Sequence, residues 1–263
     1  MATLKKNINL TFKNMDNLSE METEEQLHPL LPKQNNFRML VIGGSGTGKT
    51  NMVVQYIIRF MKIDRLYVCS KHLQQDKMVY LHKHFTELEN AVNRKLKVKK
   101  KPENFKIIMT WASDLDSFPL VDELDPAYKN VVLFDDLVCE IDKKDKIGNY
   151  YIRSRHKNCS IFYLAQSFFM IPRKVRLNTT LFSLFGLPSL TEVNRIWREV
   201  ASDLTKTEFL EYFKEAIGEE DSYGFFFINT LEKKKFLKYR SGLDGLLIEP
   251  KESNKKIKSE DSD

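Results

Sequence analysis

Residues 40–52 of this 263-residue chain read LVIGGSGTGKTNM, and this segment constrains the fold more than any other. Residues 43–50 match the pattern G-x-x-x-x-G-K-[ST] in full, after a predicted strand and at the start of a predicted helix. Glycines let such a loop turn its backbone N–H groups inward, where they and the positive end of the helix hold phosphate groups. The expected phosphate-binding residues are Gly43, Gly44, Ser45, Gly46, Thr47, Gly48, Lys49 and Thr50.

Two side chains of this loop have separate expected roles. Lys49 places a positive charge between the β- and γ-phosphates of a bound nucleotide, and the hydroxyl of Thr50 can bind Mg²⁺. The alternative is a glycine-rich turn without a ligand, which a full match between a strand and a helix disfavours. Because GTPases, kinases and motor proteins share such loops, the loop predicts a nucleotide site and leaves the reaction open.

An apolar strand further along the chain ends in two acidic residues. In NVVLFDDL, residues 130–137, four apolar residues precede Asp135 and Asp136. Asp135 is expected at the carboxyl edge of the sheet, where it can hold the hydration shell of Mg²⁺. Asp136 takes the next position, where it can polarise the water that attacks the γ-phosphate. The simpler alternative is that both are exposed carboxylates at the end of a strand.

A third strand end carries an amide. In SIFYLAQS, residues 160–167, Gln166 can contact the γ-phosphate or the attacking water, or it can simply cap the strand. The guanine-reading motif NKxD is absent from the sequence, which disfavours a GTPase. Nucleotide kinases seldom carry an apolar strand that ends in paired acids. ATP hydrolysis is therefore the favoured reaction.

Apolar strands alternate with helical segments over residues 36–188, the expected P-loop ATPase core. Such alternation predicts an α/β fold with a mainly parallel sheet that helices cover on both faces. The predicted strands are residues 37–42, 65–70, 105–111, 130–136, 160–167 and 179–187. Helices are predicted from the loop to residue 61, over residues 75–93 and over residues 147–155.

The remaining segments differ from this core. Residues 1–35 are polar and punctuated by proline, and we expect an N-terminal arm. Residues 189–248 are expected to form a small C-terminal elaboration of two helices and a hairpin made by SYGFFFINT and KKKFLKYR. Its phenylalanines can stack on DNA bases, but core packing explains them more simply. Residues 249–263 are expected to be a disordered tail.

Composition limits the compartment and the partners. The net charge of +6 permits a polyanionic partner. Two basic runs, residues 94–101 and 232–240, can contact nucleic acid or form solvated loops or edge strands. With no apolar run near the roughly 20 residues of a spanning helix, we expect no membrane association and a cytosolic or nuclear compartment. The cysteines expected to be reduced core residues are Cys69, Cys139 and Cys159.

The motifs GGSGTGKT, VVLFDD and IFYLAQS, in this order and spacing, resemble those of the poxvirus-type genome-packaging ATPases of large eukaryotic DNA viruses. That family has relatives in virophages and Maverick-type transposons and belongs to the FtsK/HerA superfamily of DNA-pumping P-loop ATPases. The resemblance covers residues 37–187. It implies ATP and Mg²⁺ as cofactors, an additional strand between the phosphate-loop strand and the paired-acid strand, and a homo-oligomeric ring.

The resemblance also assigns residue roles. The positions that match the family's motifs are Lys49, Thr50, Asp135, Asp136 and Gln166. Ring ATPases of this kind place an arginine of one subunit against the γ-phosphate of its neighbour, where it is worth about 10³ to 10⁵ in rate. In YYIRSRHKNC, Arg153 and Arg155 are the residues we expect to include this arginine. A plain surface or phosphate-contacting role is the alternative for each.

The implied partners are double-stranded DNA and capsid or other virion proteins. The implied location is the host cytoplasm or nucleus at the site of virus assembly, or the virion itself. Two other functions stay open at this point. One is another DNA-dependent P-loop ATPase, such as a helicase or loader, although further helicase motifs and a second core domain are absent from the sequence. The other is an interaction protein whose docking surface is shaped by bound nucleotide.

Overall fold

Six parallel strands form the centre of the structure, which is a computed structural model. The structure describes residues 30–31, 36–100, 105–137, 144–187, 189–219 and 223–249. Within these residues the strands form one nine-stranded sheet in the order β3-β2-β4-β5-β1-β6-β7-β8-β9. The parallel strands are β1 (Arg38–Ile42), β2 (Arg65–Ser70), β3 (Ile108–Ala112), β4 (Asn130–Asp135), β5 (Cys159–Ala165) and β6 (Leu181–Leu184). The mainly parallel α/β sheet predicted from the sequence is confirmed.

Strand β5 lies between β1 and β4. Its Phe162 is opposite Met39 on β1 and Leu133 on β4, so three strands run side by side in the same direction. Because parallel neighbours need a crossover, the chain must leave the sheet between β4 and β5 and return beside β1. The additional strand implied by the family resemblance is therefore present.

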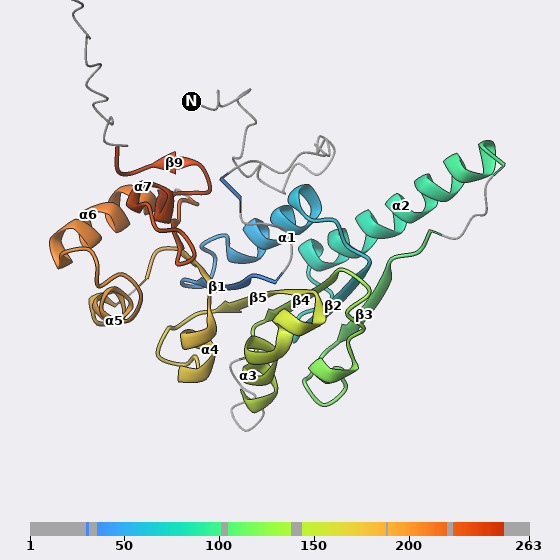
Figure 1. The fold of residues 1–263 in the computed structure, drawn as a ribbon, viewed down its shortest axis with the longest axis horizontal. Helices are drawn as coiled ribbons and strands as arrows, with labels where there is room; N and C mark the ends of the chain where they lie inside the picture. The colour runs from blue at the N-terminus through green and yellow to red at the C-terminus, as the bar shows by residue number, and fades with distance from the viewer. Residues whose placement is uncertain are drawn as a thin grey trace, which may run out of the picture.

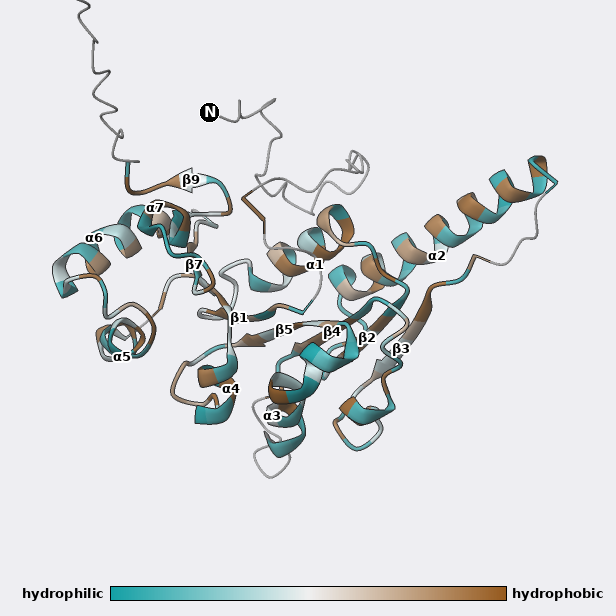
Figure 2. Ribbon diagram, viewed as in Figure 1, coloured by the Kyte–Doolittle hydropathy of each residue, from teal (hydrophilic) through white to brown (hydrophobic). Residues whose placement is uncertain are grey.

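Helices cover both faces of the sheet (Figure 1). They are α1 (Lys49–Phe60), α2 (Asp76–Val98), α3 (Lys144–Arg153), α4 (Arg173–Asn178), α5 (Leu190–Val200), α6 (Lys206–Ile217) and α7 (Lys235–Lys238), with short 3-10 helices η2 (Val121–Glu123) and η4 (Ser154–Lys157). Along β1, Met39 and Val41 join the core that includes α1 and α2, and Leu40 and Ile42 join the core on the other face. Figure 2 shows the polar and apolar residues distributed along these elements.

The C-terminal segment extends the same sheet. Strands β7 (Phe226–Asn229), β8 (Tyr239–Ser241) and β9 (Gly245–Leu246) pair antiparallel, beginning on β6. The buried chain from Phe225 to Ile228 confirms that these aromatic residues pack in the core. The boundary drawn between core and elaboration stays a prediction.

Several predicted elements differ in extent from the structure. The run KKKFLK was expected to be a hairpin strand, but it contains the short helix α7, and only Tyr239 and Arg240 of that segment enter β8. The strand predicted from residue 105 begins at Ile108, because the preceding residues bond to side chains of α2 instead. Asn93 bonds the backbone of Phe105 in both directions, and Glu89 accepts from the N–H of Ile107.

Several further predictions are tested only in part or not at all. Cys69 and Cys159 are buried free thiols, as expected, while Cys139 lies outside the described residues. The predicted tail after residue 249 also lies outside the described residues. So does the predicted N-terminal arm, apart from residues 30 and 31. In the part of the chain that the structure describes, no helix has the length and apolarity needed to cross a membrane.

Candidate functional site

The phosphate loop connects β1 to α1 through two glycines with positive φ. Gly46 has φ 77° and Gly48, the N-cap of α1, has φ 98°, a region that residues with a Cβ rarely adopt. Gly43 is needed for a different reason, since a Cβ there would lie 2.6 Å from the Cβ of Phe185. The loop therefore presents its backbone and the amino end of α1, whose first N–H groups have no acceptor within the helix. This arrangement fits a polyphosphate ligand.

The Lys49 ammonium group is anchored within the loop. Its Nζ donates to the carbonyl oxygens of Gly43 at 2.8 Å and Gly44 at 2.5 Å. Burial lowers the pKa of Lys49, and the nearby carboxylates of Asp135 and Asp136 oppose that change. The ammonium group of Lys49 thus lies between the loop and the acidic pair, where the phosphates of a bound nucleotide would lie.

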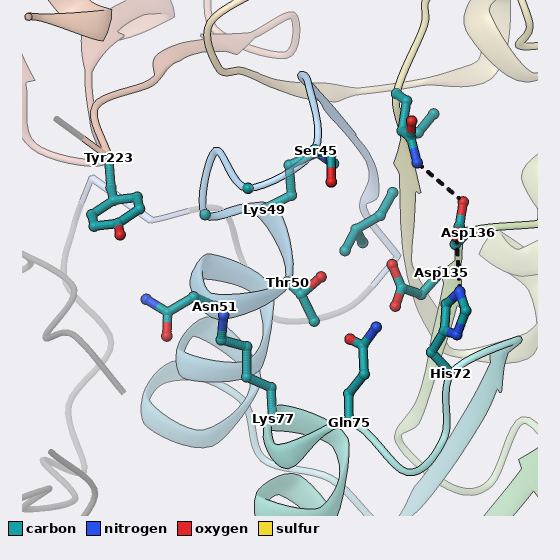
Figure 3. A pocket seen from close by; sticks show the side chains of 15 residues that line it. Ser45, Lys49, Thr50, Asn51, His72, Gln75, Lys77, Asp135, Asp136 and Tyr223 are labelled. Carbon is teal, nitrogen blue, oxygen red and sulfur yellow. Dashed lines mark hydrogen bonds and ion pairs between the residues drawn. The ribbon is translucent and has the colours of Figure 1, made fainter. Parts of the chain in front are cut away.

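Asp135 is the last residue of β4 and is buried. The Ser70 hydroxyl, at the end of the neighbouring β2, donates to its Oδ2 at 3.3 Å. Burial raises the pKa of Asp135, and the bond from Ser70 opposes this shift. Figure 3 shows Thr50 facing Asp135 across the cleft. One hydroxyl and one carboxylate oxygen are hard ligands of the kind Mg²⁺ takes, so this donor set fits Mg²⁺.

Asp136 follows β4 with φ 52°, so the backbone turns sharply where the strand ends. Its Oδ1 accepts from Nε2 of Gln166, which follows β5, at 3.4 Å. Its Oδ2 lies 3.3 Å from Nε2 of His72, which follows β2 (Figure 3). The carboxylate is therefore held between side chains from the two strands that flank β4.

One cleft is lined by the side chains of Lys49, Thr50, Asp135, Asp136 and Gln166 (Figure 3). It is also lined by residues that the sequence did not single out, namely Asn51, His72, Gln75, Lys77 and Tyr223. His72 had a weak signal, since it lies two residues beyond the end of an apolar strand, while Gln166 directly follows another. Tyr223 had none, because it is distant in sequence and reaches the loop only through the antiparallel part of the sheet. A Cβ on Gly48 would lie 3.0 Å from its Cδ1.

The two arginines predicted to act in trans lie elsewhere. Arg153 ends α3 and Arg155 lies in η4, and both precede β5, whereas the phosphate loop lies at the carboxyl edge of the sheet. Arg153 forms an ion pair with Asp122, and Nε of Arg155 lies 3.1 Å from Nε2 of His156. The structure therefore does not bring either arginine to the cleft of its own chain. A role at a neighbouring subunit stays a prediction.

A glycine loop at the amino end of α1, an acidic pair at the end of β4 and an additional strand between them define a P-loop nucleoside triphosphatase. The family described as "Poxvirus A32 protein" matches residues 27–216, and the chain belongs to this family. Family membership agrees with the resemblance drawn from the motifs, and the protein is an ATPase.

Solved structures with related folds are distant. The genome packaging NTPase B204 from Sulfolobus turreted icosahedral virus 2, in complex with AMPPCP, is 13% identical with a TM-score of 0.49, over 75% of this chain and 94% of that chain. VirB4 of Thermoanaerobacter pseudethanolicus is 9% identical with a TM-score of 0.48, over 74% of this chain and 87% of that chain. These similarities are too low to carry a functional argument. A search of curated proteins found no match.

Proposed function

We propose that this ATPase is a motor that translocates double-stranded DNA and packages a viral genome into a capsid. The observation that carries the proposal is the arrangement of the acidic pair. Asp135 faces Thr50, and Asp136 lies beside Gln166, all in one cleft with the phosphate loop. Together with membership of the poxvirus A32 protein family, this geometry favours ATP hydrolysis coupled to work on viral DNA.

Each side chain in the cleft has a proposed task. Mg²⁺, when bound with ATP, supplies positive charge beside the phosphates, and Thr50 and Asp135 would hold it. Lys49 would neutralise phosphate charge. Asp136 would accept the proton of the attacking water, and Gln166 would orient that water or contact the γ-phosphate. This arrangement supports hydrolysis, because a carboxylate would be available as a base beside the phosphate site.

The proposed contact with DNA lies on α2. The sequence predicted a basic loop over residues 94–101, but most of these residues lie on the last turns of α2. This helix projects from the body of the protein (Figure 1). With 23 residues, α2 is about 34 Å long at 1.5 Å per residue. The exposed basic residues near its end are Arg94, Lys95, Lys97, Lys99 and Lys100. Such a tip suits phosphates of any sequence, although cations at a helix carboxyl end also stabilise the helix itself.

The second basic run is less available for DNA. Lys238 pairs with Asp203 at 2.8 Å, and Lys235 donates to the backbone carbonyl of Asp203 at 2.7 Å. Arg240 is buried over the ring of Phe227. These contacts give part of the run a structural role in joining α7 and β8 to the rest of the protein.

The remaining proposals concern assembly. We place the protein in a homo-oligomeric ring, at the site of virus assembly in the host cytoplasm or nucleus or in the virion, in contact with capsid or other virion proteins. Arg153 or Arg155 would act on the nucleotide of a neighbouring subunit. Mixing Arg153→Ala/Arg155→Ala protein with Lys49→Ala protein tests this role, because one interface in the mixture combines an intact loop with intact arginines. Recovery of turnover in the mixture is expected, and two variants that stay inactive together would contradict it.

ATP turnover with and without duplex DNA, at low salt and with oligomeric protein, tests the proposed function. Duplex DNA should raise the rate, and Lys95→Glu/Lys99→Glu should weaken that response. Lys206→Glu/Lys214→Glu on α6 is the matched control with the same change of charge, and it should respond like the wild type. A rate indifferent to DNA would contradict a packaging motor and favour nucleotide-gated docking. Strand separation without displacement of a duplex-bound roadblock would favour a helicase.

A further inference from the structure

His72 lines the cleft but has no task in the proposed reaction. It follows β2 and lies beside Asp136, with 3.3 Å between its Nε2 and Oδ2 of the carboxylate. Its backbone N–H donates to the Ser70 hydroxyl at 3.1 Å, and that hydroxyl donates to Asp135. The segment after β2 is thus bonded to both members of the acidic pair.

The His72 side chain is not there to fill the core. It is 53% exposed, so its packing contributes little to stability. Because a carboxylate oxygen accepts hydrogen bonds, a stabilising contact at this distance requires the imidazole to present an N–H at Nε2. A neutral ring protonated at Nε2 meets this requirement.

Two donors fix the Asp136 carboxylate from opposite sides. Gln166 contacts Oδ1 and His72 contacts Oδ2, and the donors come from β5 and β2, which both pair with β4. With both oxygens engaged, rotation about the Asp136 side-chain bonds is restricted.

We propose that His72 is a positioning residue for hydrolysis, which holds Asp136 by its Nε2–H so that the carboxylate meets the attacking water. The proposal rests on the proposed role of Asp136 as the base. His72 itself makes no contact with the reacting atoms in this role. Its loss should therefore lower kcat and leave nucleotide binding unchanged, since the loop and Lys49 are untouched.

The test compares full-length His72→Ala, His72→Phe and His72→Gln with the wild type in steady-state ATP turnover. Misplacement of a catalytic group by about 1 Å costs roughly 100-fold, so kcat of His72→Ala should fall about 10- to 100-fold with KM for ATP unchanged. His72→Phe keeps a ring without an N–H donor and should be equally slow. His72→Gln places an amide donor near the same point and should recover most of the rate. Binding of a fluorescent ATP analogue should be the same in all four proteins.

Three results would overturn the proposal. A His72→Ala rate equal to or above the wild-type rate would mean that the contact is idle or restrains Asp136 in an inactive position. If His72→Gln and His72→Phe lose turnover to the same extent and also bind nucleotide more weakly, the role of His72 is structural. Asp136→Asn, measured alongside, separates the proposal from the function on which it rests. If Asp136→Asn turns over ATP at the wild-type rate, Asp136 is not the base and the proposed reaction is wrong. If Asp136→Asn is inactive but His72→Ala turns over ATP normally, only the role proposed for His72 is wrong.

Discussion

The two ends of the same parallel strands use their polar residues in opposite ways. At the carboxyl ends, Lys49, Asp135 and Asp136 converge on one partly enclosed cleft. At the amino ends, arginines make separate contacts and do not converge on a shared cleft. Arg65 lies 3.7 Å from Asp125 and over the ring of Tyr128, and Arg153 pairs with Asp122.

The difference follows from the topology. Every crossover in a parallel sheet returns the chain to the same edge, so strand ends that are far apart in sequence share the carboxyl edge. The amino edge also gathers strand starts, but Arg65 and Arg153 there each pair with a separate aspartate. Convergence on a shared cleft, more than the presence of charge, therefore separates the reaction site from the rest of the surface.

Removing the charge at the carboxyl edge should have the largest effect. Lys49→Ala is expected to lower ATP turnover about 10³-fold, because it removes the point charge that stabilises the phosphates. The fold should persist, as judged by circular dichroism. Lys83→Ala, an exposed lysine of α2, is the control and should match the wild type. Undiminished turnover by Lys49→Ala would show that the loop is not the reaction site.

Gln166 offers a smaller change at the same edge. Gln166→Ala removes one donor to Asp136 and the amide proposed to contact the water or γ-phosphate. Loss of one preorganised donor costs about 10² in kcat, with ATP affinity retained. Single-turnover kinetics would separate these effects. A variant that hydrolyses normally would indicate that the amide only caps β5.

Substitution of Tyr223 tests whether the cleft extends beyond the phosphate loop to bind the nucleobase. Its ring is exposed and lies against Gly48, beside the phosphate loop (Figure 3). If the nucleobase stacks on this ring, Tyr223→Ala should raise KM for ATP about tenfold with little change in kcat, whereas Tyr223→Phe should keep the wild-type KM. Equal KM values in all three proteins would place the base elsewhere.

Arg65 at the amino edge should show the smallest effect, and on stability alone. Arg65→Ala loses a guanidinium 3.9 Å from the centre of the Tyr128 ring together with the partly exposed pair to Asp125. The free energy of unfolding should fall by about 1 kcal/mol, measured by urea denaturation. Turnover and KM for ATP should be unchanged. A large loss of turnover would contradict the division between the two edges.

Much of the fold and part of the site follow from local sequence. Buried parallel strands read as continuous apolar runs, so β1, β4 and β5 stand out in the sequence. The glycine loop follows β1, the acidic pair lies at the end of β4, and Gln166 follows β5. Glycines with positive φ and a full phosphate-loop pattern leave few alternatives for the segment before α1. These features depend on neighbours in the chain and can be found without a structure.

The rest depends on contacts between distant segments. His72 reaches Asp136 only because β2 pairs with β4, and the sequence does not state strand order. The basic residues before residue 101 looked like a loop, yet α2 continues through Val98 while Asn93 holds the returning chain. The lysines before Tyr239 resembled an edge strand, but contacts with Asp203 draw them into α7. Tertiary contacts override local propensity in each case.

The most direct test of the central claim is the fate of ATP bound to Asp136→Asn. The amide keeps the shape of the side chain but cannot accept the proton of the attacking water. With radiolabelled ATP in a single-turnover experiment, this variant should bind ATP as tightly as the wild type and retain it unhydrolysed, while the wild type releases ADP and phosphate. Formation of ADP by Asp136→Asn at the wild-type rate would contradict the claim that the carboxyl edge hydrolyses the nucleotide that the loop holds.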